Sequence, residues 1–442
     1  MSVQNFYVEL DLTGLVIHNK SENMFKKVLI TGLFASIALT IQAQESMTLE
    51  NILTTIEKNN PGLKMYESEA RAFNEAAKGA YSWMPPEGGA GLFMTPYNTK
   101  EIKADKMMMK EGMGYFMVSA QQMFPSRKKQ DAEAAWMRSM STVETEKRKV
   151  ALNDLLYVAK KSYYEWLVLL KRQTVLDEGT RILDFMIKSA EIRYKNGLGK
   201  ISAYYKAKAA LANIDNMKLM LENELRQKRI MLNSLMYRNV QQEFSIDTLF
   251  TWKDFPVSIL DSAYLKSRRS DIMALQRNME VNNLQRNAEL AKLKPEFGVR
   301  YDHMIGLSTQ PSQFTIMAMV KLPLAKWSSK MNKAKAESLV WQNESLKSQQ
   351  QMILNEATGM AGSARAELET KKKQMRLYET QIVPALQKNF QTMQLGYEQN
   401  TEELFELFDA WEALNMTQLE YLEQLKTALL MQAELEKILE IK

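Results

Sequence analysis

Most of the chain carries apolar residues at the three- and four-residue spacing of helices that pack along one side. Residues 126–195 and 326–398 are predicted as two very long helices, and residues 201–237 and 402–439 as helices that return alongside them. At about 1.5 Å per residue, each long helix measures about 100 Å, far more than an ordinary globular helix. A helix of this length must lie in a coiled coil or in the wall of a tunnel.

Four short segments alternate apolar and polar residues with the period of β-strands. They fall near residues 87–97, 112–124, 296–305 and 313–322, so that one pair of strands precedes each long helix. Because two strands alone do not form a stable sheet, each pair needs partners from elsewhere in the chain or from other chains.

The two halves of the chain follow the same order of elements. Residues 44–240 are predicted as helix, two strands, long helix and return helix, and residues 258–442 repeat that order after a linker at residues 241–257. The helices that open the two halves are expected at residues 47–83 and 258–293. We interpret the chain as an internal twofold duplication.

The start of the chain has the composition of a secretory signal. Residues 24–43 comprise basic residues, an apolar run and a small-residue cleavage site, and cleavage is expected after Ala43. Residues 1–23 are interpreted as an upstream extension, with Met24 as the true start. The alternative is a membrane anchor, but the apolar run is shorter than the roughly 20 residues of a spanning helix.

Composition excludes several classes of function. The chain has no cysteine, so it forms no disulfide, thiolate metal site or cysteine nucleophile. Its net charge of +6 comes from basic residues that alternate with acidic ones along helices, so no nucleic-acid partner is expected. The run Gly197-Leu198-Gly199-Lys200 lacks the spacing of a phosphate loop, and His303 alone does not build a catalytic triad. We therefore expect neither an enzyme nor a cofactor.

Short motifs mark the strand-to-helix corners and the turns between the long and the return helices. They are Gln122-Met123-Phe124-Pro125, Leu322-Pro323-Leu324, Arg193-Tyr194-Lys195-Asn196-Gly197, Tyr397-Glu398-Gln399-Asn400 and Leu407-Phe408-Asp409-Ala410. Their order, spacing and duplication resemble the TolC family of outer-membrane efflux proteins over about residues 47–440. The first corner also resembles the heavy-metal branch of that family.

The resemblance implies a mixed α and β membrane protein. In the family, three chains each contribute four strands to one 12-stranded β-barrel in the outer membrane, and their long helices form a coiled-coil barrel across the periplasm. The implied partners are two further copies of the chain, outer-membrane lipid, a periplasmic adaptor (membrane fusion) protein and an inner-membrane pump. The expected function is a passive exit duct of a tripartite efflux system in a Gram-negative bacterium, with drugs or heavy metals as substrates.

Two alternatives stay open. An exit duct for type I polypeptide secretion would have the same architecture, and the identity of the pump would separate the two. A periplasmic structural coiled-coil protein would explain the helices. It would explain neither the signal sequence nor the four amphipathic strands.

Two acidic residues follow the second turn. The resemblance places Glu406 and Asp409 in rings of carboxylates at the periplasmic entrance of the duct, and residues three apart share a helix face. Such rings concentrate cations and exclude anions. The alternative is that both are ordinary surface acids of a Glu-rich helix.

The turns themselves are candidates for docking the adaptor. Gly197 and Asn400 suit the positive φ of a turn between antiparallel helices, and Tyr194 and Tyr397 would pack beside them. The alternative is that these residues only close helical hairpins.

Methionine is abundant, with 31 residues, and several cluster around the first strand pair, including Met107, Met108, Met109 and Met113. Thioethers suit Cu(I) or Ag(I), so the cluster is a candidate metal site. Packing of apolar surfaces is the plainer interpretation.

Overall fold

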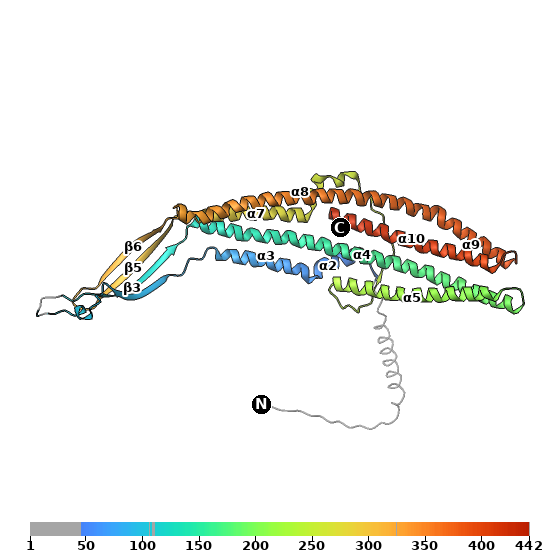
Figure 1. The fold of residues 1–442 in the computed structure, drawn as a ribbon, viewed down its shortest axis with the longest axis horizontal. Coiled ribbons are helices and arrows are strands. Elements are labelled where there is room, and N and C mark those ends of the chain that lie inside the picture. The colour runs from blue at the N-terminus through green and yellow to red at the C-terminus, as the bar shows by residue number, and fades with distance from the viewer. Residues whose placement is uncertain (1–45, 106, 108–110, 324, 442) are drawn as a thin grey trace, which may run out of the picture.

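The computed structural model describes residues 46–441 except 106, 108–110 and 324. The elongated molecule has one four-stranded sheet at one end and helices along the rest of its length (Figure 1). The expected upstream extension and signal sequence, and Met108 and Met109, lie outside the described residues. Within the described part, none of the helices combines the length and apolarity that crossing a membrane requires.

The first half contains one long helix and shorter elements on either side of it. In chain order these are β1 (Ser46–Met47), α2 (Leu49–Asn59), α3 (Pro61–Gly79), β2 (Glu87–Phe93), the 3₁₀ turn η1 (Thr99–Ile102), β3 (Tyr115–Phe124), α4 (Arg127–Lys195), α5 (Ile201–Leu235) and β4 (Ser245–Ile246).

The second half has the same order of helix, strand pair, long helix and return helix. Its elements are η2 (Val257–Leu260), α6 (Ser262–Arg268), α7 (Ser270–Ala291), β5 (Glu296–Gly306), β6 (Gln313–Lys321), α8 (Lys326–Leu377), η3 (Tyr378–Ile382), α9 (Val383–Glu398) and α10 (Leu404–Leu439).

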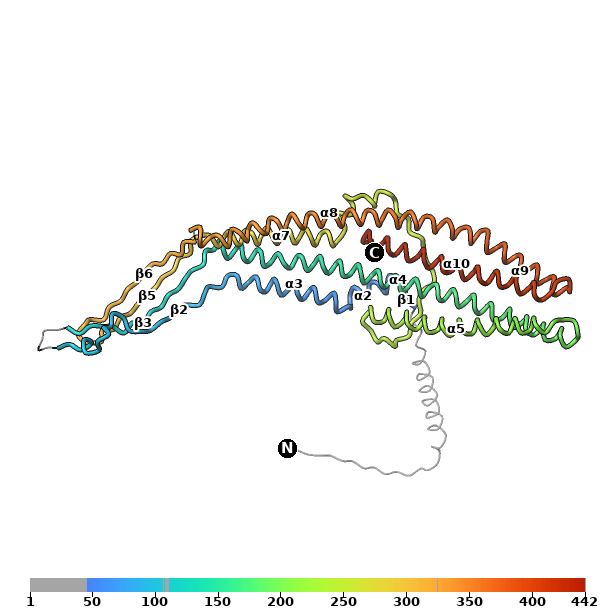
Figure 2. The backbone as a smooth tube through the Cα atoms, in the orientation of Figure 1, coloured from blue at the N-terminus to red at the C-terminus, as the bar shows by residue number. Residues whose placement is uncertain are grey.

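The two long helices run from the sheet to the far end of the molecule (Figure 2). Helix α4 is uninterrupted over 69 residues. The second long helix, expected over 326–398 as one piece, passes through the π-helical turn η3 between α8 and α9. Pro384 lies just beyond this turn and lacks the N–H of a regular helix, and a π turn absorbs that defect without breaking the helix.

The helices that open each half are broken, contrary to the single helices expected at 47–83 and 258–293. Asn60 ends α2 and caps α3 by accepting from Gly62 N, and Pro61 occupies the first turn of α3, where a missing N–H costs nothing. Extended backbone at Arg269 separates α6 from α7.

The strand expected to reach residue 97 ends at Phe93, because Met94 has a φ of +49°.

Short helices meet end to end beside the long ones, at mid-length. Asn60 Nδ2 donates to Leu235 O, at 3.1 Å, which joins the start of α3 to the end of α5. In the second half, Arg269 Nη1 donates to Ile438 O, at 2.9 Å, and Ser270 N donates to the Glu440 carboxylate, at 2.8 Å. Two shorter helices, placed end to end, therefore run along each long helix.

We call this mid-length level the equator, and it holds a hydrophobic core between α2, α4, α5 and α10. The small parallel sheet of β1 and β4, which the sequence did not predict, lies against it. The most buried residues of this hydrophobic core are Ile52, Ile56, Leu167, Leu232, Met236, Phe244 and Leu429.

The four long strands form one antiparallel sheet in the order β2-β3-β5-β6. The strand pairs of the two halves meet at β3 and β5, where Phe116 lies opposite Ile305 and Phe124 opposite Phe297. The partners that each pair needs are therefore supplied in part by the other half of the same chain. Strands β2 and β6 form the two edges.

Candidate functional site

One face of the sheet is apolar and exposed. The register places the alternate residues of all four strands on this face, and their large side chains are between about one third and two thirds exposed. Soluble domains rarely leave an apolar patch of this extent uncovered. The side chains are Leu92, Phe116, Val118, Phe124, Phe297, Val299, Tyr301, Ile305, Phe314, Ile316 and Val320.

The opposite face is polar and more sheltered. Asp302 and Glu296 on this face are 5% and 7% exposed, less than any large side chain of the apolar face. Arg300 Nε donates to Asp302 at 2.9 Å, and Lys129 contacts Glu296 at 2.5 Å. The usual arrangement of a soluble sheet, with apolar residues sheltered and polar residues outside, is inverted here.

The methionines of the sheet all lie on this polar face. Met117 is directly opposite Met304 in the register, and Met123 and Met319 lie on either side of Gly298. A side chain at Gly298 would collide with the sulfur of Met123, so the glycine makes room for it. The remaining member is Met317.

Two members of the methionine cluster expected from the sequence, Met107 and Met113, lie among the described residues. Met107 is 99% exposed and Met113 is 51% exposed, and both lie in the connection between β2 and β3. Among the described residues, no group of three or more His, Asp or Glu side chains is placed to hold a metal ion.

At the far end, two turns close the helical hairpins. We call the α4–α5 turn the first tip and the α9–α10 turn the second tip. Gly197 has a φ of +73° and Asn400 a φ of +59°, the left-handed conformation expected at both. Tyr194 and Tyr397, expected to pack alike, differ: Tyr194 is 49% exposed and Tyr397 only 3%.

Arg193 connects the two tips. Its guanidinium lies over the ring of Tyr397, 4.1 Å from the centroid, and its Nη2 donates to Tyr397 O at 2.9 Å and to Asn400 Oδ1. Burial raises the pKa of Tyr397, although the nearby Arg193 opposes this shift. The phenol of Tyr397 therefore stays neutral. Arg193 contacts the second tip through the ring face and backbone oxygen of Tyr397 and through the amide oxygen of Asn400.

The two acidic candidates have different surroundings. Asp409 is paired with Lys206 of α5, at 2.7 Å, and the Lys206 ammonium also lies 4.3 Å from the Phe408 ring centroid. Glu406 is exposed and interacts with Glu402, one turn earlier. A hydrogen bond with Glu406, together with the repulsion of its charge, raises the pKa of Glu402.

A pocket of about 320 Å³ lies between the two tips. Arg193, Gly197 and Leu198 line it from the first tip, and Tyr397 and Phe405 from the second. Leu198 is 75% exposed beside it.

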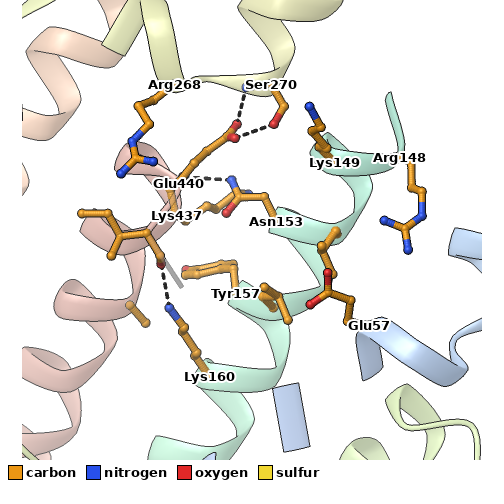
Figure 3. Close-up of a pocket in the computed structure, with 14 residues that line it drawn as sticks. Glu57, Arg148, Lys149, Asn153, Tyr157, Lys160, Arg268, Ser270, Lys437 and Glu440 are labelled. Atoms are coloured by element: carbon orange, nitrogen blue, oxygen red, sulfur yellow. Dashed lines mark hydrogen bonds between the residues drawn. The ribbon is translucent and has the colours of Figure 1, made fainter. Parts of the chain in front are cut away.

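A second pocket, of about 360 Å³, lies at the equator between α4, α7 and α10 (Figure 3). The Glu440 carboxylate accepts from Ser270 N and Oγ, and Asn153 Nδ2 donates to Lys437 O, at 2.9 Å. Burial raises the pKa of Glu440, although the Ser270 hydrogen bonds oppose this shift. These groups are engaged with one another, so we interpret this pocket as part of the helix junction.

Sequence reasoning missed Arg193 and Lys206 as site residues. Both are cations that reach residues more than two hundred positions away in the chain, so no local spacing reveals the contact. The only sequence feature that pointed to the Arg193 contact was that the tyrosines of the two tips are followed by similar turns. This similarity predicts that the two helical hairpins lie side by side. An arginine next to the tyrosine of one tip is then a candidate to contact the other tip.

No family model matches the chain, and no curated protein matches its sequence. Known structures, in contrast, match most of its length.

The fold is that of outer-membrane channels. The structure of the outer-membrane channel OprN has a TM-score of 0.69 with 13% identity, covering 89% of this chain and 90% of that one. CusC, whose structures concern folding and transmembrane channel formation, has a TM-score of 0.68 with 15% identity, covering 88% of this chain and 91% of that one. The outer-membrane protein VceC of Vibrio cholerae has a TM-score of 0.64 with 16% identity, covering 88% and 95%. The resemblance predicted from the sequence is confirmed at the level of the fold.

Proposed function

We propose that the chain forms a passive exit duct in the outer membrane of a Gram-negative bacterium, as a trimer of identical subunits. The inverted sheet carries this proposal, because an exposed apolar face opposite a sheltered polar face suits lipid outside and water inside. The open edges β2 and β6 would pair with those of neighbouring copies, which removes unpaired edges by closing a 12-stranded barrel.

The tips would be the controlled end of the duct. Tyr194, Gly197, Tyr397 and Asn400 border the region where a periplasmic adaptor would dock, and the pocket beside Arg193 suits an apolar side chain of such a partner. Glu406 and Asp409 would form carboxylate rings at the entrance. Energy would come from an inner-membrane pump.

Reconstitution of the purified chain in planar bilayers tests this function. We expect a trimer by light scattering and stepwise ion conductance. A matched pair of variants locates the lipid face: Ile316→Lys places a charge toward lipid and costs about 2–4 kcal/mol near the midplane, whereas Thr315→Lys points into the bore and is tolerated. A monomeric, water-soluble protein without conductance would favour the structural coiled-coil alternative instead.

The methionines of the polar face favour soft monovalent cations among the possible substrates. Filling of apolar surface would place methionine on the apolar face, whereas all five methionines in the strands of the four-stranded sheet lie on the polar one. Growth of a deletion strain on silver and copper salts, beside a panel of detergents, dyes and antibiotics, tests this substrate. We expect selective metal sensitivity, rescued by the wild-type gene but poorly by Met117→Leu/Met304→Leu. Sensitivity to amphiphiles alone would indicate drug efflux, and sensitivity to neither would favour polypeptide secretion.

A further inference from the structure

The long helices begin with basic residues at the end of the sheet. Helix α4 starts with Arg127, Lys128 and Lys129, and α8 starts with Lys326, with Lys330 one turn later. Neither helix has an acidic residue in its first turn. The positive end of a helix dipole favours acids, so these cations do not stabilise the helices that carry them. A different interaction must favour them.

Part of this charge is neutralised within the chain and part is not. Lys129 and Lys335 pair with the buried carboxylates of Glu296 and Glu289, at 2.5 and 2.9 Å. In contrast, Lys128, Lys326, Lys330 and Lys333 are exposed and make no ion pair within the part of the chain that the structure describes. The junction between sheet and helices therefore presents unpaired positive charge.

Exposed tryptophans lie at the same level. Trp327 is 87% exposed between Lys326 and Lys330, and Trp83 is 62% exposed just before β2. The Trp83 ring packs edge-on against Phe124, the last residue of the apolar face, with centroids 5.1 Å apart. Tryptophan concentrates where a membrane meets water, because its ring is apolar and its N–H is polar.

The length of the sheet agrees with a membrane boundary at this level. Strand β5 has 11 residues. At about 3.4 Å per residue and a tilt of about 45°, it spans about 26 Å, close to the roughly 25 Å apolar band of outer-membrane proteins. The tryptophans and lysines follow at its helical end, where lipid headgroups would lie.

We propose that this collar of residues binds anionic phospholipid headgroups of the leaflet that faces the helices. The inference rests on the proposed function, since it needs the apolar face to lie in a bilayer. Ammonium groups attract phosphate and the tryptophans hold the collar at the interface, so the collar fixes the depth and the lipid neighbours of the duct. The collar consists of Trp83, Lys128, Lys326, Trp327, Lys330 and Lys333.

Quenching of tryptophan fluorescence by brominated lipids tests the collar in the reconstituted full chain. Two of the seven tryptophans belong to it, so dibrominated lipid quenches a defined part of the emission. Competition between unbrominated phosphatidylglycerol and brominated phosphatidylcholine yields the ratio of their binding constants, because displacement of the brominated lipid restores the emission. We expect the wild-type ratio to favour phosphatidylglycerol by about fivefold or more at low salt, the factor expected from one lysine near the headgroups.

The variant Lys326→Gln/Lys330→Gln/Lys333→Gln should lower this ratio, because Lys128 is then the last lysine of the collar. The matched control Lys266→Gln/Lys373→Gln/Lys388→Gln removes the same charge far from the sheet and should leave the ratio unchanged. Trp327→Phe should remove part of the quenching. A wild-type ratio of one, or equal ratios in both triple variants, would overturn the collar. A duct that conducts without lipid preference refutes the collar alone, whereas absence of both quenching and conductance refutes the duct.

Discussion

The equator and the tips connect the two halves of the chain with similar contacts in different surroundings. At the equator, Lys160 of α4 pairs with Glu436 of α10, and the two side chains are 4% and 1% exposed. At the tips, Lys206 of α5 pairs with Asp409 of α10, and the side chains are 36% and 66% exposed. Breaking a buried pair leaves an uncompensated charge, whereas an exposed pair contributes little. The pair at the middle of the molecule is therefore costly to break, whereas the pair at its end is not.

Further contacts add to the difference between the equator and the tips. Lys253 of the linker also contacts Glu436, at 2.9 Å, and Lys160 Nζ donates to Ile441 O, at 3.1 Å, so the buried pair is held from two more segments. Burial lowers the pKa of Lys160, and Glu436 opposes this shift. At the tips, Arg193 contacts the ring face of Tyr397 and two oxygen atoms of the second tip, and water can replace hydrogen bonds of this kind at little net cost.

Removal of the equatorial cation has the largest expected effect. Lys160→Met leaves Glu436 buried with only Lys253 nearby, and we expect a loss of about 3 kcal/mol in the free energy of unfolding. Urea unfolding of the purified chain measures it. Lys161→Met, at the exposed neighbouring position, is the control and should change little. Equal stability of the two variants would contradict the anchoring role of the equator.

Removal of the tip cation should alter conduction more than stability. Arg193→Ala loses the contacts with Tyr397 and Asn400, so we expect a higher open probability in planar bilayers and a loss of about 1 kcal/mol or less in stability. Lys195→Ala is the control, because Lys195 pairs with Glu191 of its own helix. If Arg193→Ala conducts like the wild type, Arg193 does not connect the tips in the assembled duct.

The exposed ion pair should show a smaller effect. A double-mutant cycle with Lys206→Gln and Asp409→Asn is expected to yield a coupling energy of about 0.2–1 kcal/mol in unfolding. High salt should reduce this coupling, because exposed charges are screened. A coupling of several kcal/mol that does not depend on salt would mean that this pair is buried in the assembled protein and resembles the equator.

The smallest expected effect is on the pH dependence of ion selectivity. Glu406 raises the pKa of Glu402, so the proton is taken up above the ordinary pKa of a glutamate and the entrance loses negative charge as pH falls through that range. Cation selectivity from reversal potentials should then begin to decrease above pH 4.5. Glu402→Gln removes the repulsion and should move this decrease to lower pH. An identical pH profile in both proteins would place Glu402 away from the conduction path.

Local patterns in the sequence predicted the long helices and the four long strands, but not the small sheet of β1 and β4 or the breaks in the opening helices. They did not reveal contacts between residues far apart in the chain. The long run without proline after Pro125 predicts α4, because nothing in it interrupts a helix. Pro61 breaks the opening helix, although apolar spacing continues across it. Met304 joins Met117 only through the register of β3 and β5, which a single sequence does not reveal.

In the candidate site, too, local features were predictable from the sequence and long-range contacts were not. The turns at Gly197 and Asn400 are local, and their conformation was predictable from residue type. The contact of Arg193 with Tyr397 depends on how two hairpins lie side by side, and the difference in burial between Tyr194 and Tyr397 depends on it as well. Sequence therefore located the ends of the hairpins but not the side chains that join them.

Distances between spin labels test most directly whether the tips move while the equator stays fixed. The chain has no cysteine, so Leu198→Cys at the first tip and Val240→Cys near the equator each label one site per subunit. Pulsed electron paramagnetic resonance then compares each label with and without Arg193→Ala. The account predicts longer and broader distances at the tip and unchanged distances near the equator. Unchanged distances at both positions, or equal shifts at both, would contradict it.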